Sequence, residues 1–295
     1  MPQLHLITDP REFLERAGDL LASRPVVSTV LSTTVRRKIR DAERGVEPDE
    51  RDWWLVVTDD DASPIGVGMG QPPDAMRRIF LLDLPAEVID PLADLLLQRG
   101  SRVDWVNGAR PTVDRFAAAW AQRTHSRTEI DTHTRLFELG TLTPGPPSPG
   151  RLREPRPEEY ELVAAWLSRF QTEAAVQGGR EPDAGAAAVV PVEEVADRVD
   201  DHRLWVWADQ DQPVHLTGFQ PPSFGVARIG PVYTPPQFRG HGYAASAVAQ
   251  VSQRLQGEAR VCLFTDQANP VSNALYERLG YRAVVDMANH RVIPQ

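Results

Sequence analysis

The chain has 295 residues, which is enough for two domains of ordinary size, and 41% of them are hydrophobic, as in a globular protein with a sizeable core. No apolar run approaches the roughly 18 residues that a membrane span needs. A net charge of −9 argues against nucleic-acid or membrane-surface binding as the main task. The single cysteine, Cys262, can form no internal disulfide and the first residues show no export signal, so we expect a cytoplasmic protein.

A proline- and glycine-rich segment divides the chain into two halves. This segment, Thr143 to Gly150, can continue neither a helix nor a central strand. We therefore expect one domain over residues 1–142, a linker over 143–150 and a second domain over 151–295. In the first half, the basic cluster at 36–40 is expected to be a solvated helix face, because the acidic residues that follow it offset its charge.

The second half alternates between strand and helix patterns. We expect a helix from Glu158 to Ala175, whose apolar residues have helical spacing, and a loop from Gln177 to Ala188. The other expected elements are strands near 151–153 and at 203–209, 214–219, 225–234 and 260–265, a helix from 244, a short helix around 276 and a final hairpin from 281 to 293. This order predicts an α/β fold, in which helices flank a central mixed sheet on both faces.

A glycine-rich turn stands between the strand at 225–234 and the next helix. It reads Arg239-Gly240-His241-Gly242-Tyr243-Ala244. The first turn of a helix leaves backbone N–H groups without partners and carries a partial positive charge, so it attracts phosphate. The two glycines leave room for a diphosphate, and the arginine adds a cation. The pattern predicts an anion site, and the alternative is an ordinary strand-to-helix turn. The residues match neither a Walker loop nor a dinucleotide-binding fingerprint.

A second block follows the expected strand at 260–265. Asn269 and Pro270 form a helix start, because the Asn side chain caps a helix and Pro suits its first position. Gly280 fits the left-handed residue just beyond a helix end. Tyr276 is therefore expected on the second turn of a short helix, whose N-terminus faces the same strand ends as the glycine-rich turn.

Together the two blocks resemble the GCN5-related N-acetyltransferase (GNAT) superfamily. Arg239-x-x-Gly242-x-Ala244 is similar to its acyl-CoA pyrophosphate motif. The block that follows in the family is matched by Asn269-Pro270, Ser272-Asn273, Tyr276 and Gly280-Tyr281. The resemblance covers Arg151 to Pro294, about half of the chain, and the order of the two motifs is specific.

The resemblance implies transfer of an acetyl group from acetyl-CoA to a primary amine, by direct attack on the thioester. Backbone groups of one strand would pair with the pantetheine arm, and an N–H there would polarise the thioester carbonyl. The implied catalytic residues are Tyr276, as general acid for the departing thiolate, and Glu173, as the base. The implied cofactor-binding residues are Val232, Tyr233, Thr234, Arg239, Gly240, His241, Gly242, Tyr243, Ala244, Asn269 and Asn273.

Several of these residues have a structural alternative. Tyr276 can pack against the sheet and hydrogen-bond a carbonyl, Asn269 can be a plain helix cap, and Glu173 can be a solvated surface residue. We expect His241 to contribute its backbone N–H more than its ring, and His215 to be a structural histidine. No residues have metal-ligand spacing, so no metal is expected.

The two halves also resemble each other at an offset near 150, which suggests two copies of one fold. Residues 54–59 mirror 204–209, and Pro85 mirrors Pro235. The same offset sets Ile89, Asp90, Leu92 and Asp94 at the positions of Arg239, Gly240, Gly242 and Ala244, and a shift for loop length sets Ala117 at that of Tyr276. Carboxylates would repel a diphosphate, so we expect the first half to be a degenerate GNAT-like copy without a cofactor site.

The leading expectation is an acetyl-CoA-dependent N-acetyltransferase that acts on a small-molecule or peptide amine. The alternatives are a non-catalytic acyl-CoA-binding or interaction protein and a transferase that uses a longer acyl-CoA. The acidic balance slightly favours a cationic acceptor. The identity of the acceptor and of the general base, the acyl length, the oligomeric state and any contribution of the first half to the acceptor site stay open at this stage.

Overall fold

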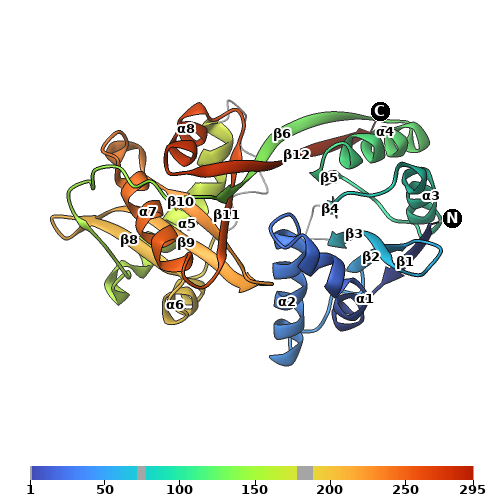
Figure 1. Ribbon diagram of the computed structural model, residues 1–295, viewed down its shortest axis with the longest axis horizontal. Helices are drawn as coiled ribbons and strands as arrows, with labels where there is room; N and C mark the ends of the chain where they lie inside the picture. Colours follow the sequence, from blue (N-terminus) through green and yellow to red (C-terminus); the bar gives the residue numbers. More distant parts are fainter. Residues whose placement is uncertain (1, 72–77, 178–188, 295) are drawn as a thin grey trace. The chain divides into compact units, whose positions relative to one another are not determined.

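Most of the expected elements form where the sequence predicts them. The computed structural model describes residues 2–71, 78–177 and 189–294. The strands β1(Gln3–Ile7) to β12(Tyr281–Pro294) form a mixed sheet in the order β1-β2-β3-β4-β5-β12-β6-β11-β10-β9-β8-β7, and helices flank it (Figure 1). The predicted fold class is confirmed. The loop expected from Gln177 to Ala188 lies, beyond Gln177, outside the described residues.

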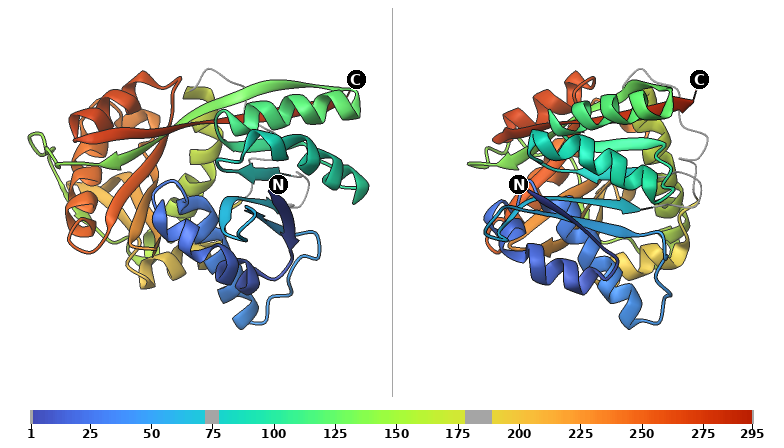
Figure 2. Two further views of the ribbon diagram at one scale, coloured as in Figure 1. Left: turned by 45° about the vertical axis from the view of Figure 1, so that its right-hand side comes forward. Right: turned by 90° about the vertical axis from the view of Figure 1, so that its right-hand side faces the viewer.

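The chain forms two compact units, residues 1–135 with 284–295, and residues 136–283. The division falls inside β6(Ser126–Leu139) and β12, the two long strands that lie side by side in Figures 1 and 2. It therefore differs from the expected division at 143–150, because the end of β12 pairs with β5(Trp105–Ala109) of the first unit. The hairpin expected over 281–293 is wrong: this segment is one continuous strand, and it has no glycine and no proline before Pro294 to make a turn.

The first unit contains one complete set of sheet and helices. Besides its strands it has the helices α1(Pro10–Ser23), α2(Thr29–Glu43), α3(Ile89–Gln98) and α4(Thr112–Thr124). The remaining strands are β2(Trp53–Thr58), β3(Pro64–Gln71) and β4(Arg78–Leu81), and the 3-10 turn η1(Ala86–Val88) precedes α3. Helices α3 and α4 cover one sheet face through residues such as Leu92 and Phe116, which pack with Val57 and Val106.

The second unit repeats this order of elements. It runs β7(Arg151–Arg153), η2(Pro157–Glu159), α5(Tyr160–Gln177), α6(Val192–Asp200), β8(Leu204–Asp209), β9(Gln212–Ser223), β10(Val226–Tyr233), η3(Pro236–Phe238), α7(Tyr243–Leu255), β11(Arg260–Asp266) and α8(Pro270–Arg278). In both units a proline with nearly the same backbone angles, Pro85 or Pro235, leads from a strand into a 3-10 turn and then a helix. The two copies inferred from the sequence are thus confirmed element by element.

The sheet of the second unit has helices on both faces. Because successive strand residues point to opposite faces, Leu204 and Val206 pack with α5 and α6, whereas Trp205 packs with α7. On the first of these faces α5 also contacts Tyr233, near the end of β10. The two helix layers therefore meet the same end of β10 from both sides.

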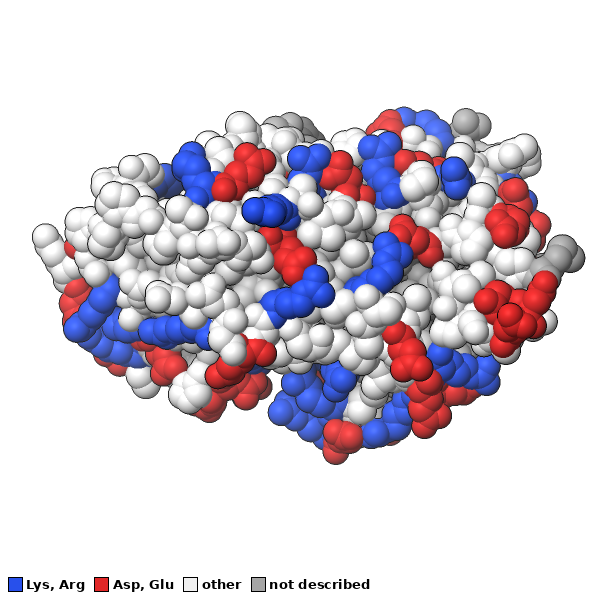
Figure 3. Space-filling view, in the orientation of Figure 1, with Lys and Arg blue, Asp and Glu red and all other residues white. Residues whose placement is uncertain are grey.

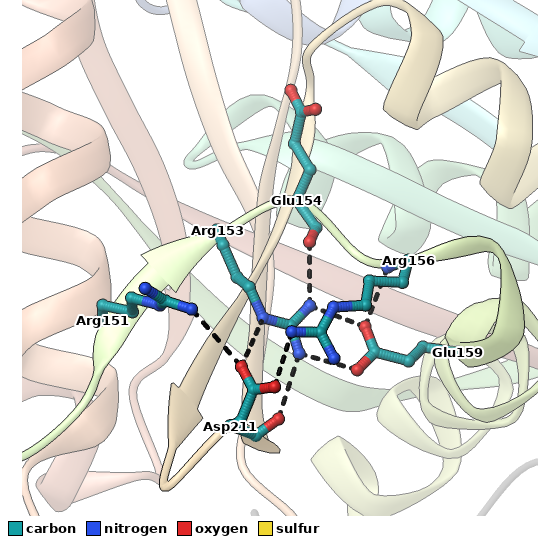
Figure 4. A network of polar contacts seen from close by, with 6 residues as sticks. All are labelled: Arg151, Arg153, Glu154, Arg156, Glu159 and Asp211. Atoms are coloured by element: carbon teal, nitrogen blue, oxygen red, sulfur yellow. Dashed lines mark hydrogen bonds and ion pairs between the residues drawn. The ribbon is translucent and has the colours of Figure 1, made fainter.

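A polar network fixes the start of α5 (Figure 4). Arg153 binds both carboxylate oxygens of Glu159 at 2.7 Å, and the backbone N–H of Arg156 donates to the same carboxylate at 2.8 Å. Asp211, in the turn between β8 and β9, accepts from Arg156 at 2.6 Å. Arginine with a carboxylate in this bidentate geometry is a strong, directional pair, so the network orients the helix that carries Glu173.

Charged side chains of both signs lie on the surface. On the face drawn in Figure 3, blue and red groups lie next to one another, with broad white areas between them. Within the basic cluster of α2, Lys38 pairs with Asp52 at 2.5 Å, and near the end of the same helix Glu43 pairs with Arg11 at 2.6 Å. Among the helices of the described residues, none combines the length and the apolar character that crossing a bilayer requires.

Candidate functional site

Two parallel strands of the second unit separate at one end. The pairing of β10 with β11 begins at Val226 and ends at Ile229, which faces Leu263. Strand β10 then continues to Tyr233, and its pairing with β9 on the other side resumes at Val232 after a register shift. Residues 230–233 of β10 therefore extend beyond their ladder with β11, so the sheet opens between these two strands.

The corresponding strands of the first unit stay paired. Strand β4 pairs with β5 along its whole length, from Arg78 to Leu81, which faces Gly108. A Cβ atom on Gly108 would lie 1.8 Å from the carbonyl oxygen of Leu81, so only glycine allows this close approach. The opening found in the second unit is thus closed in the first.

The glycine-rich turn lies directly after the open strand. Residues 239–242 connect η3 to α7, and Gly240 and Gly242 have φ angles of 80° and 77°. Both values lie in the left-handed region, which other residues adopt only at a cost. Gly242 is the N-cap of α7 and offers no side chain to it, whereas Asn269 caps α8 through its side chain.

The turn exposes a run of unpartnered amide groups. In the described part of the chain, the N–H groups of residues 240–245 have no hydrogen-bond acceptor; the first helical N–H with one is that of Ser246, which donates to Gly242 at 3.1 Å. A capped helix start satisfies some of these donors, and an ordinary start leaves about four. A left-handed residue followed by right-handed helix also turns successive N–H groups toward one concave side. This segment therefore presents a row of free backbone donors, an arrangement that suits an anion.

Arg239 does not point freely into solvent. Its Nη2 atom lies 2.6 Å from Oε2 of Glu173, and its Nε–H donates to the carbonyl of Thr234 at 3.0 Å. The other oxygen of Glu173, Oε1, accepts from the hydroxyl of Tyr233 at 2.8 Å. The residue predicted to be the base and the residue predicted to bind phosphate are therefore an ion pair.

The polar side chains at the end of β10 and just beyond it are hydrogen-bonded. Burial, followed by the hydrogen bond to Glu173, raises the pKa of Tyr233 to about 12, so its hydroxyl keeps its proton. Thr234 bonds through Oγ1 to Nδ1 of His215 at 2.7 Å. Burial lowers the pKa of His215 to about 3, so this histidine is neutral and structural at ordinary pH, as its strand position suggested.

Tyr276 lies on the second turn of α8, and its ring belongs to the core cluster of β10, α7 and β11. It is 5% exposed and meets the ring of Tyr281 edge-on at 6.0 Å. Burial raises the pKa of Tyr276. Within the described residues its hydroxyl has no hydrogen-bond partner, so the carbonyl contact proposed as its structural alternative is not formed. The tyrosine is held by packing, with its O–H available as a donor.

Asn269 and Asn273 brace the loop between β11 and α8. The side chain of Asn269 accepts the N–H of Ser272 at 3.1 Å, which is the predicted cap. The amide nitrogen of Asn273 donates to the carbonyls of Asn269 and Asp266, at 2.7 and 3.0 Å. Gly280 has the predicted left-handed φ, 97°. These bonds give both asparagines a loop-orienting role.

Residues 163–281 match the model of the acetyltransferase (GNAT) family. This part of the chain is a GNAT domain. Members of this family typically use acetyl-CoA, and the separated strands, the glycine turn and Tyr276 all lie within the matched residues. No curated protein has a significantly similar sequence.

The whole chain has the fold of tandem GNAT proteins. A GCN5-related N-acetyltransferase from Sphaerobacter thermophilus matches 98% of this chain over 95% of its own, with a TM-score of 0.62 and 15% identity. A Drosophila protein matches 99% over 98%, with a TM-score of 0.64 and 13% identity. A tandem GNAT protein from the clavulanic acid biosynthesis pathway matches 98% over 98%, with a TM-score of 0.56 and 13% identity. At these identities the matches show the fold.

The first copy lacks the glycine turn altogether. Its η1 ends at Val88 and α3 begins at Ile89, whereas the residues 239–242 of the GNAT domain separate η3 from α7. The residue-by-residue correspondence expected from the fixed offset is therefore wrong here: Ile89 matches Tyr243 as the first helical residue, not Arg239. Asp90 and Asp94 instead bind Arg123 of α4, at 2.8 and 2.6 Å. The first copy has no such loop, so residues 239–242 have no counterparts there.

The structure adds one residue that sequence reasoning missed. Ser148, in the proline-rich linker, donates its hydroxyl to the carbonyl of His241 at 2.8 Å. No local pattern connects two residues 93 positions apart, so only the fold brings them together. The ring of His241 turns back on its own loop, with Nδ1 at 2.8 Å from the carbonyl of Arg239. Within the described ranges, no group of three or more histidine, cysteine or acidic residues is arranged to hold a metal ion.

Proposed function

We propose that this protein is an acetyl-CoA-dependent N-acetyltransferase, with one cofactor site in the GNAT domain. The observation that carries the proposal is the run of unpartnered N–H groups at residues 240–245, at an uncapped helix start beside an open strand. A diphosphate carries two negative charges and many acceptor oxygens, which suits these donors and the positive end of the helix. The residues present therefore fit coenzyme A.

The open edge of β10 suits the rest of the cofactor. An extended amide-containing arm can pair with backbone groups that have lost a neighbouring strand, as in strand addition. Residues 230–233 offer such an edge, and because Pro231 has no N–H, the donors beyond this proline are those of Val232 and Tyr233. An N–H of Val232 or Tyr233 would hold the thioester oxygen as charge develops on it, an effect worth about 3–4 kcal/mol in known oxyanion holes.

Acetyl-CoA supplies an acetyl group activated as a thioester. The nitrogen of the acceptor amine forms the new C–N bond, the C–S bond breaks, and the thiolate takes one proton. Tyr276 is our candidate donor of that proton, because its buried hydroxyl is protonated at neutral pH and has no competing partner among the described residues. Its raised pKa also makes it a weaker acid, so the proton would move only as negative charge develops on sulfur.

Glu173 is our candidate for the base that accepts the proton of the amine. In the structure both of its oxygens accept hydrogen bonds, from Tyr233 and Arg239. These two bonds stabilise the charged form of Glu173 and make it a weaker base, so its basicity would rise when one of the donors turns away. A diphosphate at the glycine turn would attract Arg239, whose side chain is 38% exposed, and this would release the carboxylate for the acceptor.

The first unit has neither the opening nor the glycine turn, so we propose that it binds no cofactor. Calorimetry with coenzyme A tests the proposal, with an expected stoichiometry of one per chain. Arg239→Glu should weaken the affinity strongly, because it places a carboxylate beside the diphosphate. No affinity in the wild-type chain, or a second site that survives this change, would refute the proposal.

Turnover needs a separate measurement. Release of free thiol from acetyl-CoA should depend on an added primary amine, tested with a panel of cationic and neutral small amines and peptide amines. Tight binding without amine-dependent release, unchanged in Tyr276→Phe, would instead favour a non-catalytic acyl-CoA-binding protein. Faster release from a longer acyl-CoA than from acetyl-CoA would favour the third candidate.

A further inference from the structure

Two side chains hold alternate carbonyl groups of the glycine turn. The hydroxyl of Ser148 donates to the carbonyl of His241 at 2.8 Å. The Nδ1 atom of His241 lies 2.8 Å from the carbonyl of Arg239 and 3.3 Å from that of Phe238. A carbonyl can only accept, so Nδ1 carries the hydrogen in this arrangement. The peptide groups that follow Arg239 and His241 are thus both held from their oxygen side.

Holding these oxygens also sets the direction of two N–H groups. A trans peptide is planar, and its C=O and N–H point in opposite directions. The N–H of Gly240 belongs to the peptide of Arg239, and that of Gly242 to the peptide of His241. Both are among the unpartnered donors of residues 240–245. With its carbonyl turned toward Ser148, the peptide of His241 must direct the N–H of Gly242 away from the linker.

Ser148 is itself firmly anchored. Its backbone N–H donates to the hydroxyl oxygen of Ser246, in the first turn of α7, at 2.8 Å. The next residue, Pro149, accepts the indole N–H of Trp207 at 2.7 Å. Gly242 faces the serine closely, because a Cβ on this glycine would lie 2.8 Å from the Ser148 hydroxyl oxygen. The backbone on both sides of the Ser148 side chain is therefore hydrogen-bonded, and this holds the serine against the glycine turn.

We propose that Ser148 is a positioning residue of the cofactor site, which acts through the His241–Gly242 peptide to aim the Gly242 N–H at the diphosphate. This inference rests on the proposed function. Glycine residues have the largest conformational freedom to lose, so a free Gly-x-Gly turn would have to be ordered when the ligand binds. A turn that is already held in the binding geometry avoids that cost, and this raises affinity.

Coenzyme A affinity, measured by calorimetry on the full chain, tests the inference. Ser148→Ala removes one neutral hydrogen bond and should weaken binding roughly 3- to 10-fold. Ser148→Thr keeps the hydroxyl and should restore most of the affinity. The matched control is Thr143→Ala, which removes another linker hydroxyl, one that donates to the carbonyl of Thr141 two residues earlier in the chain. Equal loss in the control, or no rescue by threonine, would overturn the inference.

A second measurement separates positioning from general loosening. In protein labelled with 15N-glycine, inorganic pyrophosphate should shift the amide signals of both Gly240 and Gly242. Ser148→Ala should reduce the response of Gly242 and leave that of Gly240, whose peptide is held by His241. Equal responses in the variant and the wild type would overturn the inference while leaving the proposed function intact. If the wild-type chain binds no coenzyme A, the proposed function fails and this inference with it.

Discussion

Arg239 and Glu173 form an ion pair, with 2.6 Å between Nη2 and Oε2. In the proposed reaction the arginine would bind coenzyme A, and the glutamate would take a proton from the acceptor amine. The arginine stands at the glycine turn, where a diphosphate is expected, and the glutamate on α5 is the candidate base. The carboxylate of Glu173 binds the guanidinium of Arg239. A ligand that draws one of these two side chains away therefore leaves the other without its charged partner. The pair is a direct physical connection between the cofactor side and the acceptor side of the proposed site.

Replacing Glu173 with a neutral residue should therefore lower turnover without weakening coenzyme A binding. In Glu173→Gln, Arg239 loses its charged partner, so coenzyme A affinity should stay equal or rise by up to about 5-fold, since a partly exposed pair is worth about 0–1 kcal/mol. Turnover should fall, because the glutamine cannot take a proton. Calorimetry and thiol release measure the two effects. Glu161→Gln, on the exposed side of the same helix, is the control, and lower cofactor affinity in Glu173→Gln would contradict the interpretation.

Removing the hydroxyl of Tyr276 should affect chemistry alone. Tyr276→Phe should lower turnover about 10²- to 10⁴-fold, the usual contribution of a general acid, with no loss of coenzyme A affinity. The free energy of unfolding should hardly change, because the hydroxyl has no hydrogen-bond partner among the described residues.

The matched control is Tyr281→Phe, because the ring of Tyr281 packs against that of Tyr276. Its hydroxyl shares a buried hydrogen bond of 2.7 Å with Ser252. This variant should lose about 1–2 kcal/mol of stability and keep its turnover per folded molecule. The assignment of Tyr276 fails if the two variants show the same turnover.

A methyl group at Gly242 should damage both folding and binding. The φ angle of 77° is strained for any residue with a Cβ, by about 1–2 kcal/mol, and the new methyl would also meet the hydroxyl of Ser148. Gly242→Ala should therefore lower the melting temperature and weaken coenzyme A binding by more than 10-fold. In a Ser148→Ala background the steric part of the stability loss should disappear. Gly257→Ala, with no heavy atom within 4 Å of its new Cβ, should be nearly neutral.

The network of Figure 4 should make stability depend on acid pH. Partial burial alone would raise the pKa of Glu159, but hydrogen bonds from Arg153 and from the backbone of Arg156 outweigh it and lower the pKa. A carboxyl whose pKa falls on folding stabilises the protein above its unfolded pKa, and that contribution is lost as the pH falls through the folded value.

Glu159→Gln should therefore cost roughly 2–3 kcal/mol at pH 7 and progressively less as the pH falls below the ordinary pKa of glutamate, as urea unfolding would measure. The exposed neighbour Glu158 gives the control, because Glu158→Gln should have a small effect that does not vary in this way. A pH-independent loss in Glu159→Gln would show that shape, not charge, holds the start of α5.

The sequence by itself determined the features that depend on a few neighbouring residues. The cap at Asn269, the left-handed glycine at 280 and the helix of Tyr276 all follow from local backbone chemistry, and all form as predicted. The alternation of strands and helices determined the fold class in the same way, because burial on one or both faces leaves a periodic pattern in the chain.

Only the tertiary structure decided what these features meet. The partners of Arg239 and His241, at positions 173 and 148, lie 66 and 93 residues away in the chain. The opening between β10 and β11, and the pairing of β12 with β5, depend likewise on which strands become neighbours. Such contacts leave no local pattern, because the energy that selects them comes from packing across the whole sheet and not from the preferences of any one segment.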